Sequence, residues 1–150
     1  MLTPAAQVSV RPLSVLVVED HQDVAQTLAQ YLELCCGFRV TVAADGESGV
    51  RDGLADPPDA VVADIGLPGK DGFQLARELT GTLSPRPLLI AVTAYAGDDM
   101  RERGKAAGFD HYLVKPVDPR EVEELLRAHE RRLAAAPDRP PPTRLTGPRA

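Results

Sequence analysis

Polar side chains able to do chemistry follow four short apolar runs of this sequence, at points where buried strands would end. They are two adjacent acids, a third acid, a hydroxyl and an ammonium group: Glu19-Asp20, Asp64, Thr93 and Lys115. Because the carboxyl ends of parallel strands lie at one edge of a sheet, these groups are expected to converge. Three carboxylates packed together repel one another, and Mg²⁺ relieves that repulsion while still accepting a phosphoryl oxygen. The pattern therefore indicates a magnesium site prepared to receive phosphate.

The elements that must position these groups alternate between strand and helix. Short apolar or alternating runs predict strands at residues 13–18, 38–43, 60–63, 88–92 and 112–114. Helical spacing predicts helices at residues 23–36, 45–54, 73–79, 98–107 and 119–133. Five such pairs imply an α/β fold with a doubly wound, five-stranded parallel sheet. Its natural closure is the strand order 2-1-3-4-5.

Two helix ends have clear local signals. Gly37 is expected to end the first helix, as glycine does at a helix C-terminus. The last helix is expected to begin after Asp118 as N-cap, with Pro119 at its first position and Glu121 completing a capping box.

Composition limits the function classes. The formal net charge is −5, and no dense Lys/Arg stripe precedes the tail, so direct nucleic-acid binding is not expected. The adjacent Cys35 and Cys36 resemble reduced cytosolic residues, and no signal peptide or apolar membrane span is visible. We expect a cytoplasmic protein with a flexible segment at residues 1–12, one domain at 13–136 and a disordered Pro/Arg-rich tail at 137–150.

The strand-end residues also match a known set of motifs. After the acidic pair come D-x-x-x-P-x-x-x-G from Asp64 to Gly72, Thr93-Ala94, and Lys115-Pro116. In this order, from about residue 13 to 133, the sequence resembles the receiver domain of two-component response regulators. The resemblance implies the flavodoxin-like receiver fold and a phosphoacceptor that is not an enzyme, since it catalyses only its own phosphorylation and slow self-dephosphorylation.

Carried over position by position, the resemblance assigns roles. Asp64 would take a phosphoryl group from a phosphohistidine, and Lys115 would neutralise charge on that group. Glu19, Asp20, Asp64 and the backbone carbonyl of Gly66 would hold Mg²⁺, for which Mn²⁺ could substitute. Thr93 would bond the phosphoryl group and, with Tyr112, form the switch. The Lys115-Pro116 peptide bond would be cis.

The resemblance also implies partners. A sensor histidine kinase or a histidine phosphotransfer protein would donate the phosphoryl group. A downstream protein would bind the face of the fourth helix, fifth strand and fifth helix, roughly Asp98 to Arg127, and a homodimer is possible. With only a short tail after the last helix, we expect a stand-alone receiver or one similar to those of hybrid histidine kinases.

Two further residues bear on how long a phosphoryl group would last. Gly66 has no side chain to orient a hydrolytic water, and Tyr95 is bulky enough to shield the group. We therefore expect slow self-dephosphorylation.

Three alternatives stay open. A haloacid-dehalogenase-like phosphatase also uses a strand-ending aspartate with Mg²⁺, but it carries D-x-D, and Gly66 stands at that second position. An FMN-binding flavodoxin-like protein shares the architecture but has no use for the strand-end acids. A receiver fold that signals without phosphorylation is the third.

Overall fold

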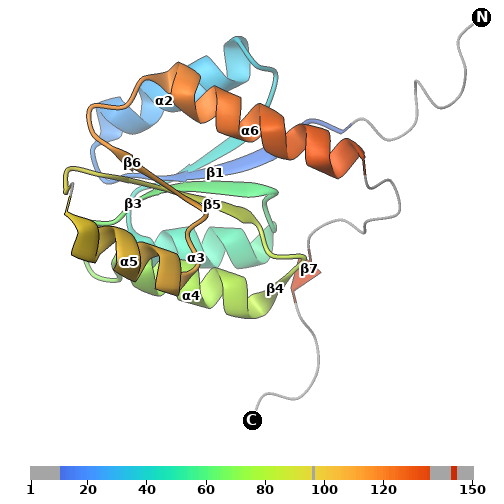
Figure 1. Cartoon of the computed structure of the whole chain (residues 1–150). Coiled ribbons are helices and arrows are strands. Elements are labelled where there is room, and N and C mark those ends of the chain that lie inside the picture. Colours follow the sequence, from blue (N-terminus) through green and yellow to red (C-terminus); the bar gives the residue numbers. More distant parts are fainter. Residues whose placement is uncertain (1–10, 96, 136–142, 145–150) are drawn as a thin grey trace, which may run out of the picture.

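The computed structural model describes residues 11–95, 97–135 and 143–144. A central parallel sheet is built from β1 (Ser14–Val18), β2 (Arg39–Ala43), β3 (Ala60–Asp64), β5 (Leu88–Thr93) and β6 (His111–Val114). The connecting helices are α2 (Gln22–Leu34), α3 (Gly46–Ala55), α4 (Gly72–Thr82), α5 (Asp98–Ala107) and α6 (Pro119–Ala134). Helices α2 and α6 cover one face of the sheet, and α3, α4 and α5 cover the other (Figure 1).

The strand order confirms the predicted topology. The sheet runs β2-β1-β3-β5-β6 with every neighbouring pair parallel, which is 2-1-3-4-5 when only the strands of this sheet are counted. The order reverses between β1 and β3, which are hydrogen-bonded neighbours. Ligands of doubly wound sheets bind outside the strand ends at this reversal. Glu19, Asp20 and Asp64 follow or end these two strands, so the topology itself brings the acids together.

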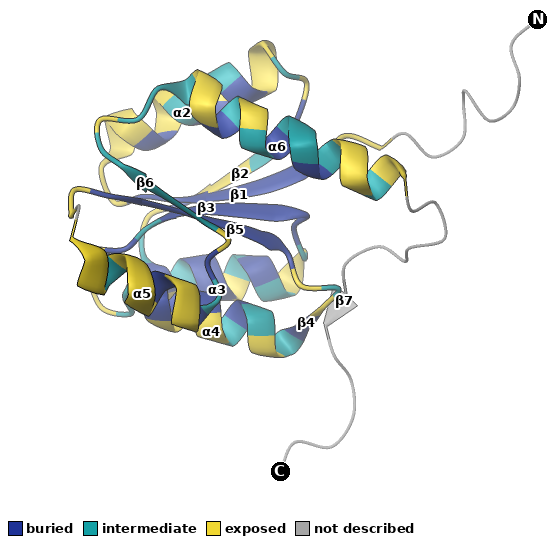
Figure 2. Cartoon of the chain, in the orientation of Figure 1, coloured by how far each residue is buried: buried dark blue, intermediate teal, exposed yellow. Residues whose placement is uncertain are grey.

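The core lies in two layers, one on each face of the sheet (Figure 2). Because side chains alternate along a strand, Leu16 of β1 packs in the layer under α3 and α4, whereas Val17 packs in the layer under α2 and α6. Strands β1, β3 and β5 are buried on both faces. Burying a leucine or valine fully contributes roughly 1.5–3 kcal/mol, so these aliphatic runs fix the strand ends firmly.

Capping boxes define the N-termini of α3 and α4. Asp45 before α3 and Asp71 before α4 both form capping boxes, with Ser48 and Gln74 respectively. The capping box expected at the last helix is wrong in its second half. The Asp118 carboxylate accepts from the Arg120 amide and from the Arg120 guanidinium, and the Glu121 side chain forms no reciprocal bond to the Asp118 amide.

A second, two-stranded ladder was not predicted. β4 (Leu83–Ser84) follows α4 and pairs antiparallel with β7 (Thr143–Arg144). Residues 143–144 of the expected disordered tail therefore form a strand, and the rest of that tail lies outside the described residues. The Ser84-Pro85 bond is cis.

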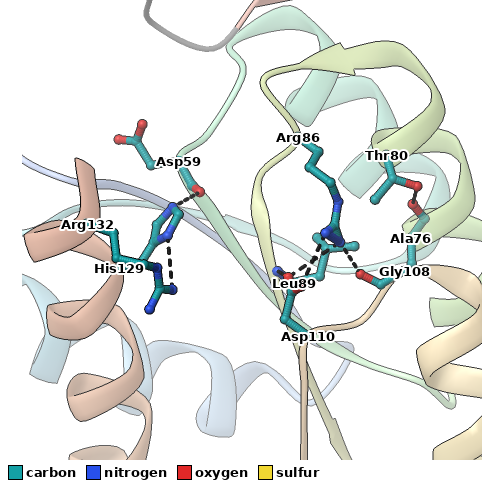
Figure 3. Close-up of polar contacts among 9 residues, drawn as sticks. All are labelled: Asp59, Ala76, Thr80, Arg86, Leu89, Gly108, Asp110, His129 and Arg132. Atoms are coloured by element: carbon teal, nitrogen blue, oxygen red, sulfur yellow. Dashed lines mark hydrogen bonds and ion pairs between the residues drawn. The ribbon is translucent and has the colours of Figure 1, made fainter. Parts of the chain in front are cut away.

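The opposite edge of the sheet is tied by Asp59. Its buried carboxylate accepts from the Ser14 amide at 2.9 Å and from both terminal nitrogens of Arg11. The Asp59 carbonyl lies 3.1 Å from Nε2 of His129 on α6 (Figure 3). Arg11 belongs to the segment expected to be flexible, of which residues 1–10 lie outside the described part. Within the described residues, no helix is long and apolar enough to cross a bilayer.

Candidate phosphoryl-acceptor site

Three carboxylates meet at the carboxyl edge of β1 and β3. One oxygen each from Glu19, Asp20 and Asp64 lies within 4.8 Å of the others. Glu19 is buried, with its side chain only 7% exposed, and the Asp64 side chain is 12% exposed, whereas Asp20 is open to solvent. The site is therefore an acidic cluster with two largely buried carboxylates and one that is exposed to solvent.

Lys115 supplies the counter-charge. It follows β6, and its Nζ lies 3.0 Å from both Glu19 Oε1 and Asp64 Oδ2. Partial burial alone would lower the pKa of Lys115, but the hydrogen bonds that its ammonium group donates to Asp64 and Glu19 outweigh that effect and raise the pKa above its usual value. The ammonium group therefore stays protonated across the physiological range. The Lys115-Pro116 peptide bond next to it is cis.

The loop after Asp64 folds back over its own strand. The Gly66 amide donates to Asp64 Oδ1 at 3.0 Å, and the Gly72 amide donates to the Ile65 carbonyl at 3.0 Å. A Cβ on Gly72 would lie 2.7 Å from both the Asp64 carbonyl oxygen and Ile65 Cα, so only glycine permits this approach. The close packing fixes the backbone that carries Asp64. The Gly66 carbonyl, expected to hold a metal, stays a prediction.

Thr93 and Tyr112 are joined through Tyr95. Thr93 ends β5 with 1% exposure, and its Oγ1 accepts from the Tyr95 amide at 3.2 Å. The Tyr112 hydroxyl donates to the Tyr95 carbonyl at 3.0 Å. Desolvation raises the pKa of Tyr112, so its hydroxyl stays a donor at neutral pH. The two predicted switch residues are thus connected through the backbone amide and carbonyl of Tyr95, and the sequence analysis did not predict this connection.

Further residues complete the site. The His21 backbone amide donates to Glu19 Oε2 at 3.0 Å, which orients that carboxylate, and the His21 side chain is not part of the carboxylate cluster. An open hollow of about 610 Å³ runs from the acids between the sheet and the start of α2 and α6. Its lining is mainly aliphatic, including Val24, Leu28 and Val122. Helical periodicity revealed α2 but could not reveal that its first turns border a cavity.

The donor set fits a hard divalent cation. Carboxylate oxygens are the ligands that Mg²⁺ prefers, and three carboxylates converge here. One of them, Asp20, is exposed, so water can complete the coordination of the ion. No histidine or cysteine joins this cluster of the described residues, so the chemistry favours Mg²⁺ over Zn²⁺.

Comparison with known proteins agrees with this geometry. The sequence profile described as the response regulator receiver domain matches residues 15–127. This chain is a member of the response regulator receiver family. The receiver domain is 36% identical over 121 residues to the response regulator MprA of Mycolicibacterium vanbaalenii, a match covering 81% of this chain and 52% of that protein.

Solved receiver structures are similar in fold. One is a CheY-like response regulator receiver domain protein from Methanospirillum hungatei, with 28% identity and a TM-score of 0.72 over 81% of this chain and 99% of that one. Another is the receiver domain of the sensor histidine kinase PA1611 from Pseudomonas aeruginosa, described with magnesium coordinated in the active site cleft. It shows 33% identity and a TM-score of 0.67 over 79% of this chain and 97% of that one. The chain spans about half the length of the curated regulator that it matches.

Proposed function

We propose that this receiver domain accepts a phosphoryl group on Asp64 in a Mg²⁺-dependent reaction. The observation that carries the proposal is Lys115 Nζ at 3.0 Å from both Asp64 and Glu19, beside the cluster of three carboxylates. An ammonium group in this position can neutralise the negative charge of a phosphoryl group transferred to Asp64. Stabilising this charge is the main requirement of phosphoryl transfer.

The positions of these groups support the following reaction. An Asp64 carboxylate oxygen attacks the phosphorus of a phosphohistidine. The P–O bond of an acyl phosphate forms, the P–N bond breaks, and the imidazole leaves with the electron pair and takes a proton from water. Lys115 exchanges its bond to Asp64 Oδ2 for one to a phosphoryl oxygen. The Thr93 hydroxyl donates to another phosphoryl oxygen and gives up the Tyr95 amide.

Glu19, Asp20 and Asp64, with the Gly66 carbonyl as a fourth protein oxygen, would hold the metal. When bound, Mg²⁺ would neutralise phosphoryl oxygens, and Mn²⁺, which also favours oxygen ligands, would substitute. The donor is a sensor histidine kinase or a histidine phosphotransfer protein. The output is a protein target that binds the face of α5, β6 and α6, with no role for nucleic acid or membrane contact in this domain.

The test is intact-mass measurement of the purified protein after incubation with acetyl phosphate, with MgCl₂ or with EDTA. We expect one added phosphoryl group that requires Mg²⁺ and is absent in Asp64→Ala. Asp23→Ala is the matched control, because Asp23 is an exposed acid in the first turn of α2 outside the carboxylate cluster. No adduct in the wild type, even with a phosphorylated kinase, would favour a receiver fold that signals without phosphate.

We also propose a long-lived phosphoryl group. A Cβ on Gly66 would meet only Asp64 Oδ1, at 3.9 Å, so the space beside the acceptor that a water-orienting side chain could fill is free of protein atoms. Tyr95 is 59% exposed, and its amide contacts Thr93. Gly66→Asn should shorten the phosphoryl half-life by about tenfold or more, because positioning a water for attack has effects of this size. Tyr95→Ala should shorten the half-life by a similar factor, because it removes the ring that shields the phosphoryl group from water. A wild-type half-life of seconds would refute the proposal.

A further inference from the structure

The hollow of about 610 Å³ beside the carboxylate cluster lies between the sheet and the first turns of α2 and α6, which cover the same face (Figure 1). We call it the aliphatic hollow. Four of its lining residues are charged, and the others are valine, leucine, alanine or proline except for Thr27. Small-molecule sites have volumes of about 300–1,000 Å³ and mostly apolar walls with a few polar groups. The aliphatic hollow therefore has the size and the lining of a ligand site.

The face of α2 that borders the aliphatic hollow is progressively less buried toward the N-terminus of the helix. Val24, Leu28 and Leu32 lie four residues apart, so they share one face. Leu32 is fully buried, Leu28 is half-buried, and Val24 is 44% exposed. Folding therefore leaves apolar surface of Val24 and Leu28 uncovered, and this surface lies at the end of α2 that is next to the acids.

The charged lining residues lie at the end of the aliphatic hollow next to the acceptor. Glu19, Asp64 and Lys115 end or follow strands, and Asp23 comes from the first turn of α2. Three acids and one lysine give this end a net charge of −2. Lys115 already pairs with Glu19 and Asp64, and Asp23 has no ion-pair partner among the described residues. A cationic group is therefore attracted to this end, and an anionic group is repelled.

The exposed apolar surface around the aliphatic hollow is too limited for a protein partner of ordinary size. Among the described residues, the large hydrophobic side chains that are exposed belong to Val24, Leu34, Val42 and Tyr95, and of these Val24 alone lines the hollow. The exposed Gln26 beside Val24 on α2 is polar. A stable protein interface buries about 800 Å² on each partner around an apolar centre. A ligand that fits inside the hollow matches this surface better.

We infer that the aliphatic hollow binds a small amphipathic cation, such as an alkylammonium ion, and that the bound cation keeps phosphodonors from Asp64. The ammonium group lies at the acids, and the alkyl chain covers Val24 and Leu28. An ammonium group in this position occupies carboxylate oxygens that a metal ion and a phosphoryl group need. The binding is independent of the proposed phosphorylation, but the effect on Asp64 rests on it.

Binding is tested with three molecules that share an eight-carbon chain: octylammonium, 1-octanol and octanoate. Each is added to the protein in EDTA up to about 3 mM, a range that reports weak association, and amide chemical shifts are followed by NMR. We expect shifts at the first turns of α2 and α6 with octylammonium, at least about tenfold weaker binding of octanoate, and an intermediate affinity of 1-octanol. Hexylammonium should bind about tenfold more weakly than octylammonium, because it buries two methylene groups fewer.

Val24→Asn tests the position of the alkyl chain, and Val42→Asn is its matched control. The two valines are 44% and 41% exposed, but Val42 lies on β2 outside the aliphatic hollow. Val24→Asn should weaken octylammonium binding by about fivefold or more, and Val42→Asn should bind as the wild type does within about twofold. Equal loss in both variants, shifts that are absent or spread over the whole protein, or octanoate binding as tight as that of octylammonium would each overturn the site.

The effect on Asp64 is measured by intact mass after incubation with acetyl phosphate and MgCl₂. At an octylammonium concentration of about three times its Kd under these conditions, labelling of the wild type and of Val42→Asn should slow by about fourfold, and labelling of Val24→Asn should slow less. Binding without slower labelling would overturn the exclusion of phosphodonors alone. Binding of octylammonium to protein that accepts no phosphoryl group at all would uphold the ligand site and refute the proposed function, and with it the exclusion.

Discussion

Replacing Asp20 with asparagine should stabilise the protein without divalent cations and remove most of its stabilisation by Mg²⁺. Asp20 is the exposed member of the carboxylate cluster, and it lies within 4.8 Å of Glu19 and Asp64. Lys115 forms its two short contacts with Glu19 and Asp64, so Asp20 contributes repulsion that no ion pair among the described residues offsets. The same carboxylate is the one most available to a metal ion.

The magnitude follows from the separation and the exposure. Two like charges at about 4 Å repel by roughly 1 kcal/mol in water, and this limit applies because Asp20 is exposed. Asp20 takes part in two such pairs, and longer-range attraction to Lys115 cancels part of their sum. A net gain of about 1 kcal/mol in the free energy of unfolding remains, which corresponds to a rise of about 2–4 °C in Tm for a domain of this size.

Thermal unfolding followed by circular dichroism, in EDTA and in MgCl₂, measures both effects. At a free Mg²⁺ concentration about ten times Kd, the wild type should gain about 1.4 kcal/mol, and Asp20→Asn should gain little. Asp23→Asn is the matched control, because it removes the same charge from the first turn of α2, where an acid favours the helix dipole. It should lower Tm slightly and keep the response to Mg²⁺.

Two results would refute this reasoning. A lower Tm of Asp20→Asn in EDTA would show that its carboxylate makes a stabilising contact rather than a repulsive one. An undiminished Mg²⁺ response of Asp20→Asn would show that the ion binds elsewhere, even if the repulsion is real. High salt should shrink the gain in EDTA, because screening weakens repulsion between exposed charges.

Two further predictions concern the backbone under Asp64 and the contact between α2 and α6. Gly72→Ala places a Cβ 2.7 Å from the Asp64 carbonyl oxygen, so it should lower the free energy of unfolding in urea by about 1–3 kcal/mol and slow phosphorylation. The control Gly81→Ala, whose Cβ would have nothing within 4 Å, should not destabilise the protein. Equal unfolding midpoints of the two variants would contradict this prediction. A hydrogen bond to Glu123 raises the pKa of Tyr31 from 10.0 to about 12, so its stabilising effect is complete below pH 10 and is lost as the pH rises through 12. Spectrophotometric titration should show a tyrosine component near 12 that Tyr31→Phe removes, and its persistence in that variant would disprove the assignment.

Much of the site could be predicted from sequence because its parts are locally encoded. Each acidic or basic residue ends or follows its own strand, and an apolar run that stops at Asp64 or Lys115 is visible without any long-range information. The alternation of strands and helices then implies a parallel sheet, whose geometry brings the strand ends together. The capping boxes at Asp45 and Asp71 were equally local and were missed, although the aspartates and their partners three residues later are visible in the sequence.

Other features depended on pairs of residues far apart in the chain. The contact between Lys115 and Glu19 spans 96 positions, and the pairing of β4 with β7 joins two-residue strands too short to give a periodic signal. The path from Thr93 through Tyr95 to Tyr112 uses backbone groups, which every residue carries alike.

The sequence alone therefore determined which chemical groups this protein brings to the edge of its sheet, because strand-end residue types are a local property. Only the tertiary structure decided which of these groups form hydrogen bonds, ion pairs or packing contacts with one another. Hydrogen bonds and ion pairs depend on separations of about 3 Å, and packing of both faces of the sheet sets such separations. The ion pair of Arg86 with Asp110 became visible for the same reason, since the two residues lie 24 positions apart in the chain.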